Sequence, residues 1–435
     1  MHRKLVFTLA LATAAFSTAP ARAAALTPTE QRIVAEVRAW SGDATVLLER
    51  SARINSGTMN LAGVRAVGAV FAQEFEKLGF RTAWLDMPPD MRRAGHLVAV
   101  RDGKRGKRLL LLGHLDTVFE ADAPGPLWDR EGAGDYARGQ GVGDMKGGNV
   151  VVVAALRALQ RVGALDDTRI TVMFTGDEED AGEPRSVSRR DMVELAKRSD
   201  IALGFEGTVT DQGRATATVG RRATASFDLE VKARQGHSQG VFGPGGYGAV
   251  YEAARILDSF RREVVEPGLT FNPGLILGGT DVAYDEAKGG GTASGKTNVI
   301  ANTVTVKSDL RYLDYAQRDR AQARMREIVA QGLPGAGATI TFRDSYPPMA
   351  VTPGNLKLLE VYSQASSDAG LGTIAALPAT ARGAGDIQFV APYIDSLDGL
   401  GASGSGAHSP AERVELASIE RAAIRTALLI YRLTR

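Results

Sequence analysis

A histidine and two aspartates occupy positions suited to metal binding. His114 and Asp116 directly follow the apolar run Leu109–Leu112, and Asp144 ends the glycine-rich stretch GQGVGD. Four consecutive apolar residues at this position predict a buried parallel strand. Because open α/β sheets bind ligands outside the carboxyl ends of their strands, these side chains are expected to converge at that edge.

Other potential metal ligands also come just after predicted strands or in loops. The pair Glu178–Glu179 comes after a predicted strand at 169–175, Glu206 ends a predicted strand at 201–205, and His408 lies in the loop GSGAHSPAE. Imidazole and carboxylate ligands without sulfur suit Zn²⁺, Mn²⁺ or Co²⁺. Each residue alone could equally be a solvated loop side chain. Together they exceed what one catalytic metal needs and favour two metals with a bridging carboxylate.

The composition narrows the classes of function. The chain has 435 residues, a formal net charge of +2 and no cysteine. The near balance of charge gives no reason to expect nucleic acid or an anionic membrane as a partner. Without cysteine there are no disulfides, no thiolate ligands and no catalytic thiol.

Residues 1–23 are typical of a signal peptide. Arg3 and Lys4 precede an apolar run from Leu5 to Phe16, and Ala21-Arg22-Ala23 forms a cleavage signal. The expected product is a periplasmic or secreted protein that is not held in a membrane after cleavage. The alternative is an uncut N-terminal anchor, although the run is short for a membrane span.

The order of elements predicts the architecture. Alternating strands and helices in 24–215 and 331–435 favour a doubly wound, mainly parallel α/β sheet as the catalytic domain. A strand at 339–343 is expected to resume this pattern. Between them, 216–330 alternates apolar and polar residues and contains two helical stretches, which indicates a small α+β domain inserted in the first.

These motifs and their order resemble the M20 family of metallopeptidases over essentially the whole mature chain. The motifs are GHLDTV, GQGVGDMKGG, GDEE, the isolated Glu206, GHS in the insertion and GAHSP near the end. The resemblance implies two zinc ions, with His114 and Glu206 on one, Glu179 and His408 on the other, and Asp144 between them. It further implies that Asp116 orients His114 and that Glu178 is the general base. It also implies that the inserted segment 216–330 is a lid or dimerisation domain.

The same resemblance suggests roles for residues outside the metal site. His237 would stabilise the developing oxyanion, often from the partner subunit of a homodimer, while Asn298 and Arg311 would bind the substrate carboxylate. The alternatives are a histidine that caps a turn and, for Arg311, an ion pair on a strand surface. Arg382 and Arg214 are further candidates for an acidic substrate side chain, with a surface arginine as the alternative for each.

The predicted function is hydrolysis of the amide bond to a C-terminal amino acid by a glutamate carboxypeptidase-like exopeptidase, acting on small peptides. An N-acyl amino acid deacylase is the alternative, and a non-catalytic binding protein is a third possibility.

The stretch 290–297, GGTASGKT, matches a phosphate-loop pattern. Such a loop needs a strand before it and a helix after it, and a strand-like segment follows instead. Trp128 is expected to pack against neighbouring side chains, and His96 to be a structural or surface histidine without a role in the site.

Overall fold

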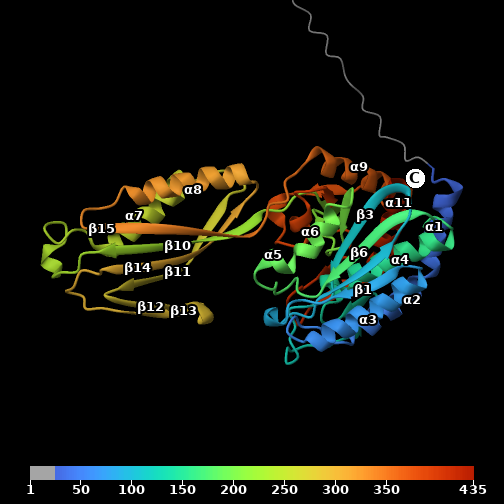
Figure 1. Ribbon diagram of the computed structural model, residues 1–435, viewed down its shortest axis with the longest axis horizontal. Helices are drawn as coiled ribbons and strands as arrows, with labels where there is room; N and C mark the ends of the chain where they lie inside the picture. The colour runs from blue at the N-terminus through green and yellow to red at the C-terminus, as the bar shows by residue number, and fades with distance from the viewer. Residues whose placement is uncertain (1–24) are drawn as a thin grey trace, which may run out of the picture.

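The computed structural model describes residues 25–435, so the predicted signal peptide lies outside the described part (Figure 1). The chain forms two lobes joined by two neighbouring linkers. The larger one, which we call the catalytic domain, contains the N- and C-terminal parts, and the smaller one, the second lobe, spans 223–346. Within the described residues, no helix is both long and apolar enough to cross a bilayer.

A six-stranded sheet organises the catalytic domain, in the order β1-β2-β6-β3-β7-β17. The three pairs from β6 to β17 are parallel, and the two pairs at the β1 edge are antiparallel. This confirms the predicted mainly parallel α/β sheet. The strands are β1 (Arg81–Leu85), β2 (His96–Arg101), β3 (Arg105–His114), β6 (Thr168–Thr175), β7 (Ile201–Gly204) and β17 (Asp395–Leu397).

Side chains cover both faces of this sheet. They bury β3, which has apolar residues on both of its sides. Leu109 and Leu111 enter the larger core, whereas Leu110 and Leu112 enter a smaller core on the other face. Helices α1 (Pro28–Ala39), α2 (Ser41–Ala52), α3 (Leu61–Lys77), α4 (Gly147–Arg161), α9 (Pro353–Asp368) and α11 (Leu416–Leu433) contribute to the larger core. Helices α6 (Arg190–Ala196) and α10 (Ile387–Val390) contribute to the smaller one.

The N-terminal helix α1 begins with a side-chain cap. Thr27 is the N-cap of α1 and forms a capping box with Glu30, which satisfies backbone N–H groups at the start of the helix. Trp128 packs partly buried against the larger core. His96 is fully buried: its Nε2 lies 3.1 Å from the Ser188 carbonyl oxygen. The structural interpretations of these two residues are confirmed.

The second lobe is an antiparallel sheet of order β11-β14-β10-β15 with two helices packed against it. Its members are β10 (Ala223–Ala233), α7 (Gly248–Glu263), β11 (Thr270–Gly279), β14 (Thr303–Tyr312), α8 (Tyr315–Ala330) and β15 (Ala336–Tyr346). The prediction that the strand at 339–343 belongs to the catalytic domain is wrong, because β15 pairs with β10. At the other boundary, β9 (Arg214–Thr218) pairs with β16 (Ala375–Leu377) of the catalytic domain.

A hairpin of β12 (Asp281–Asp285) and β13 (Gly290–Ser294) extends from β11. The phosphate-loop pattern begins in β13 and continues into turns, and no helix follows it before α8. The context that a phosphate loop requires is therefore missing from this part of the described chain.

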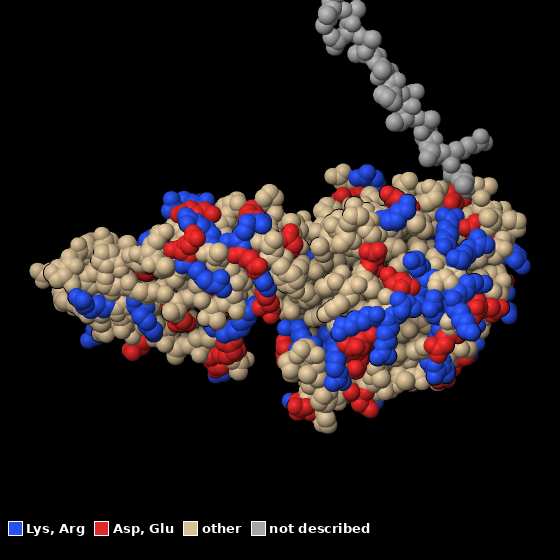
Figure 2. Space-filling view, turned by 45° about the horizontal axis from the view of Figure 1, so that its top comes forward, with Lys and Arg blue, Asp and Glu red and all other residues tan. Residues whose placement is uncertain are grey.

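The two linkers between the lobes lie against each other. Arg221 and Met349 exchange backbone hydrogen bonds of 2.9 and 3.1 Å, so the chain leaves and re-enters the catalytic domain at one place. On the face shown in Figure 2, acidic and basic side chains are intermixed over both lobes, and a waist separates the lobes. The remaining short strands are β4 (Asp129–Glu131), β5 (Tyr136–Arg138), β8 (Thr210–Asp211), β18 (Gly404–Ser405) and β19 (Arg413–Glu415), and α5 is the one-turn helix Arg185–Ser188.

Candidate metal centre

Asp144 lies between two histidines from distant parts of the chain. Its Oδ1 is 3.2 Å from Nε2 of His114, at the end of β3, and its Oδ2 is 3.1 Å from Nε2 of His408, in the β18–β19 turn. Each carboxylate oxygen thus faces a different imidazole. A carboxylate in this position can bridge two cations, each held by one histidine.

Two further carboxylates complete the group. Glu179 Oε2 lies 3.2 Å from His408 Nε2, and Glu206 Oε1 lies 3.6 Å from His114 Nε2. Parallel pairing of β3 with β6 and β7 brings these residues together, because each follows the carboxyl end of its strand. Glu179 and Glu206 are therefore on opposite sides of Asp144, one near each histidine.

Asp116 supports this arrangement through hydrogen bonds. Its fully buried carboxylate accepts hydrogen bonds from the backbone N–H groups of Glu178 (3.0 Å) and Glu179 (3.1 Å) and from the Thr58 hydroxyl (2.6 Å). Its backbone oxygen is 3.0 Å from Nδ1 of His114. Because Nδ1 is held in this way, Nε2 is directed toward Asp144 and Glu206.

The concentration of acidic groups perturbs their protonation. Burial, together with the charge of Asp144, raises the pKa of Glu206 to about 7. Burial also raises the pKa of Glu178 well above its usual value. Hydrogen bonds to Asp144 and Glu179 raise the pKa of His408 to about 10. The cluster thus carries more negative charge than its own side chains can neutralise, which a bound cation would relieve.

The donor set fits divalent metals. His114, Asp144 and Glu179 form one group of potential ligand atoms within 4.8 Å of one another, and His114, Glu178 and Glu206 form another. Glu179 Oε1 is buried and accepts no hydrogen bond from the described residues. A buried carboxylate oxygen without a donor needs another partner, and a cation is the one that this nitrogen and oxygen set suits.

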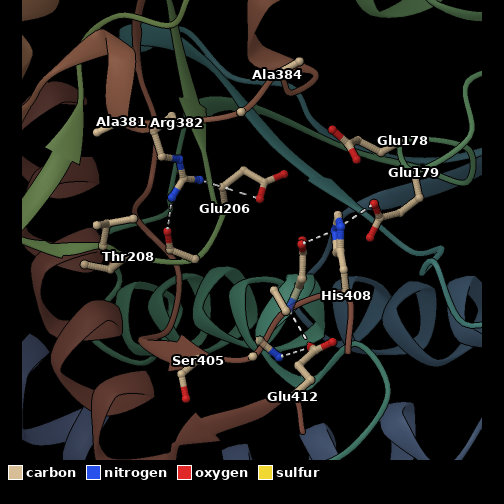
Figure 3. Close-up of a pocket in the computed structure, with 18 of the residues that line it drawn as sticks. Glu178, Glu179, Glu206, Thr208, Ala381, Arg382, Ala384, Ser405, His408 and Glu412 are labelled. Atoms are coloured by element: carbon tan, nitrogen blue, oxygen red, sulfur yellow. Dashed lines mark hydrogen bonds and ion pairs between the residues drawn. The ribbon is translucent and has the colours of Figure 1, made fainter. Parts of the chain in front are cut away.

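A cavity of about 550 Å³ opens over the cluster. Figure 3 shows Glu178, Glu179, Glu206, His408 and Arg382 around it. Tyr346, the last residue of β15, also lines the cavity, and its hydroxyl lies 3.4 Å from the Glu178 carbonyl oxygen. The second lobe thus contributes a side chain to the cavity through its final strand.

Two groups that support the site were not singled out from the sequence. Glu412 accepts hydrogen bonds from the backbone N–H groups of Gly143 (2.8 Å) and Asp144 (3.0 Å). Arg189 is buried between Asp177 and Asp386 under the loop that carries Glu178. Glu412 follows His408 by four residues, so its place in that motif was the available signal. Nothing in the spacing of Arg189 indicated its role.

Among the remaining candidates Arg382 lines this cavity, whereas the others do not lie at it within the described chain. His237 is exposed, and its backbone pairs with Val299, next to the exposed Asn298. Both residues lie at the end of the second lobe to which β10 leads. The 11 residues of β10 span roughly 36 Å at about 3.3 Å per residue. Arg311 forms an ion pair with Asp309 at 2.9 Å, which is its alternative interpretation. Arg214 is exposed at the start of β9, whereas Arg382 does line the cavity.

Residues 110–432 match the model of peptidase family M20/M25/M40. The chain is 30% identical over 395 residues to carboxypeptidase G2 from Pseudomonas sp. (strain RS-16), covering 88% of this chain and 87% of that protein. It is 26% identical over 367 residues to succinyl-diaminopimelate desuccinylase from Delftia acidovorans, covering 81% and 88%.

The fold resembles that of a dinuclear metal-binding M20 peptidase from Bacillus subtilis, with a TM-score of 0.64 at 13% identity over 91% of this chain and 99% of the other. The family match covers most of the chain and includes the segments that carry the metal-binding candidates. The chain therefore belongs to peptidase family M20/M25/M40 and is a metal-dependent peptidase or amidohydrolase.

Proposed function

We propose that this protein is a di-zinc exopeptidase that hydrolyses the amide bond to a C-terminal amino acid. The observation that carries the proposal is Asp144, whose two oxygens face two histidines, each with a further carboxylate beside it. His114 and Glu206 would hold one ion and Glu179 and His408 the other, with Co²⁺ or Mn²⁺ as possible replacements for zinc. When bound, such ions polarise a carbonyl and lower the pKa of water.

Glu178 is the proposed general base. Its side chain lines the cavity, and its raised pKa suits a group that accepts a proton from the attacking water and then donates it to the departing amine. Glu179 next to it is directed toward His408, so the adjacent acids have different partners. Asp116 holds both through their backbone N–H groups.

The test is release of a C-terminal amino acid from dipeptides, N-acyl glutamates and N-acetyl amino acids, by protein loaded with zinc and by protein treated with chelator. Glu178→Gln should lose at least about 100-fold in kcat while still binding two metals per chain, because it removes the base but no proposed ligand. Glu194→Gln, an exposed glutamate on α6, is the control. Full activity of the Glu178 variant would refute the assigned base.

The same panel separates two substrate classes. A preference for dipeptides supports a carboxypeptidase, whereas a preference for N-acyl amino acids supports a deacylase, the activity class of the desuccinylase relatives. Two metals bound without turnover of any member would favour the binding-protein alternative. We also propose export, tested by whether the N-terminus of the protein recovered from cells follows Ala23.

A homodimer is proposed because His237 and Asn298 lie far from the cavity of their own chain. If His237 acts in the partner's site, mixing His237→Ala with Glu178→Gln should restore activity. Half of the dimers in an equal mixture are mixed and each has one intact site, so about a quarter of the wild-type activity is expected. If His237 acts within its own chain, or not at all, the mixture gains nothing over its components.

A further inference from the structure

Arg382 presents a guanidinium group to the cavity from the catalytic domain. It follows the single turn Ala379–Ala381, and its side chain is only 11% exposed. Its Nη1 donates to the Gly207 carbonyl oxygen at 2.7 Å, whereas its Nη2 is 3.8 Å from Glu206 Oε2, beyond hydrogen-bond distance (Figure 3). A guanidinium has five N–H donors, and the bond to Gly207 is the one hydrogen bond that the Arg382 side chain makes to the described residues.

The loop that carries Arg382 is held by a second arginine. Arg221, fully buried at the start of the linker to the second lobe, donates through Nη1 to the carbonyl oxygens of Gly383 (2.8 Å) and Ala384 (2.9 Å). A Cβ on Gly385 would lie 3.1 Å from the Arg221 guanidinium carbon, so the loop lies tightly against this side chain. Arg221 is thus a positioning residue for Arg382.

The two arginines differ in how their charges are compensated. Nε and Nη2 of Arg221 both donate to Asp398, a buried carboxylate that neutralises it. The two carboxylates that act most on the charge of Arg382 are Asp398 and Glu206. Asp398 is hydrogen-bonded to Arg221, and the proposed function assigns Glu206 to a metal ion. A largely buried guanidinium stays charged, and a buried charge without a dedicated counterion favours binding of an anion.

We propose that Arg382 binds a carboxylate of the substrate other than the one on its C-terminal residue's backbone. The cavity then selects amides that carry a second carboxylate, either on the acyl group or on an amino-acid side chain. A planar guanidinium can hold a carboxylate through two parallel hydrogen bonds, which gives both affinity and orientation. This inference rests on the proposed function, because it assumes that Glu206 is committed to a metal.

The first test compares substrates that differ by one carboxylate: N-succinyl with N-acetyl alanine, and peptides ending in glutamate with those ending in glutamine. Arg382→Gln should lower kcat/KM for the charged member of at least one pair by roughly 10- to 100-fold, mainly through KM, as expected for loss of a charge-assisted hydrogen bond. The neutral member should change by less than about threefold. Arg190→Gln, at an exposed arginine on α6 outside the cavity, should change neither.

An alternative role for Arg382 is to orient Glu206. In that case Arg382→Gln would lower kcat equally for all substrates and weaken metal binding, and this result would overturn the proposal. Arg382→Lys keeps the charge but not the paired donors, so it should recover only part of the preference for the charged member.

A binding experiment separates failure of this inference from failure of the proposed function. Calorimetry with the zinc-loaded Glu178→Gln protein would compare glutarate with butyrate, which share one carboxylate and differ by the second. Glutarate should bind at least about tenfold more tightly, and Arg382→Gln should remove that difference. Equal binding of the two acids would refute the carboxylate site even if amides are hydrolysed, and a lasting difference without hydrolysis would refute only the proposed reaction.

Discussion

Arg189→Met should strongly destabilise the catalytic domain. The Arg189 side chain is 1% exposed and donates hydrogen bonds to Asp177 Oδ1 (2.6 Å), to the Asp177 carbonyl oxygen (2.8 Å) and to Asp386 Oδ1 (2.7 Å). Asp386 also accepts from the Thr175 hydroxyl at 2.6 Å. Methionine fills much of the same volume but leaves two buried carboxylates without a cation.

The expected loss is about 3 to 5 kcal/mol, the usual cost of removing one partner from a buried ion pair. A loss of 1 kcal/mol lowers the melting temperature of a domain this large by about 2 to 4 °C. The variant should therefore melt roughly 6 to 20 °C below the wild type. The Glu178–Glu179 loop adjoins this network, so its order should also decrease.

Tryptophan fluorescence provides a specific assay, since all three tryptophans, Trp40, Trp84 and Trp128, lie in the catalytic domain. Melting should be measured on metal-free protein, because bound metal adds its own stabilisation. Arg81→Met, which breaks an ion pair that is about three-quarters exposed on both sides, is the control and should cost at most about 1 kcal/mol.

A triple variant, Arg189→Met with Asp177→Asn and Asp386→Asn, should recover part of the loss because no buried charge is left uncompensated. The reasoning is refuted if Arg189→Met melts within about 2 °C of the wild type, or if the triple variant is no more stable than the single one.

Three further outcomes are expected. Asp116→Asn should weaken divalent-metal binding by about 10- to 100-fold in a chelator competition assay, since Asp116 orients the Glu178–Glu179 loop and lies beside His114; unchanged affinity would contradict this. Burial alone would raise the pKa of Glu30, but hydrogen bonds from Thr27 and Arg432 lower it. Stability gained from a lowered carboxyl pKa is present above the unfolded pKa and is lost as pH falls through the folded one, so Glu30→Gln should destabilise at pH 7 and progressively less below about pH 4 in urea titrations. In Gly148→Ala the new Cβ would lie 2.0 Å from the Phe205 carbonyl oxygen, so the urea midpoint should fall by the equivalent of about 1 to 3 kcal/mol. An unchanged midpoint would show that the backbone at Phe205 moves without cost.

The sequence predicted the catalytic sheet well because its signals are local. The apolar run Leu109–Leu112 is buried on both faces as expected, and His114 ends that strand. The strand order required knowledge of pairing between distant segments, such as β17 with β7, which no local pattern contains. The same limit explains the wrong assignment of β15, since an alternating strand fits the edge of either sheet equally well.

Prediction of the site succeeded where a motif ends a strand and was incomplete elsewhere. The five proposed metal ligands and Glu178 lie together, although their roles stay predictions. His237, Asn298 and Arg311 were grouped by resemblance, but within one chain His237 and Asn298 lie at the end of the second lobe that β10 leads to, and Arg311 pairs opposite Thr224 at the other end. In the proposed homodimer a second chain would bring them to one site, and a single sequence does not describe that second chain.

The position of the second lobe in the chain has a consequence for biosynthesis. All of its strands lie within 223–346. The last strand of the catalytic sheet, β17, is synthesised later, at 395–397, and helix α11 of the same domain follows at 416–433. At about 5 to 20 residues per second, the ribosome needs roughly 3 to 10 s to add the residues between the end of β15 and the end of β17. During that interval the second lobe can fold, but β7 (Ile201–Gly204), which is apolar and buried in the finished protein, has no outer neighbour. An unpaired apolar edge of this kind promotes aggregation, so the nascent chain is most vulnerable after its inserted part is complete.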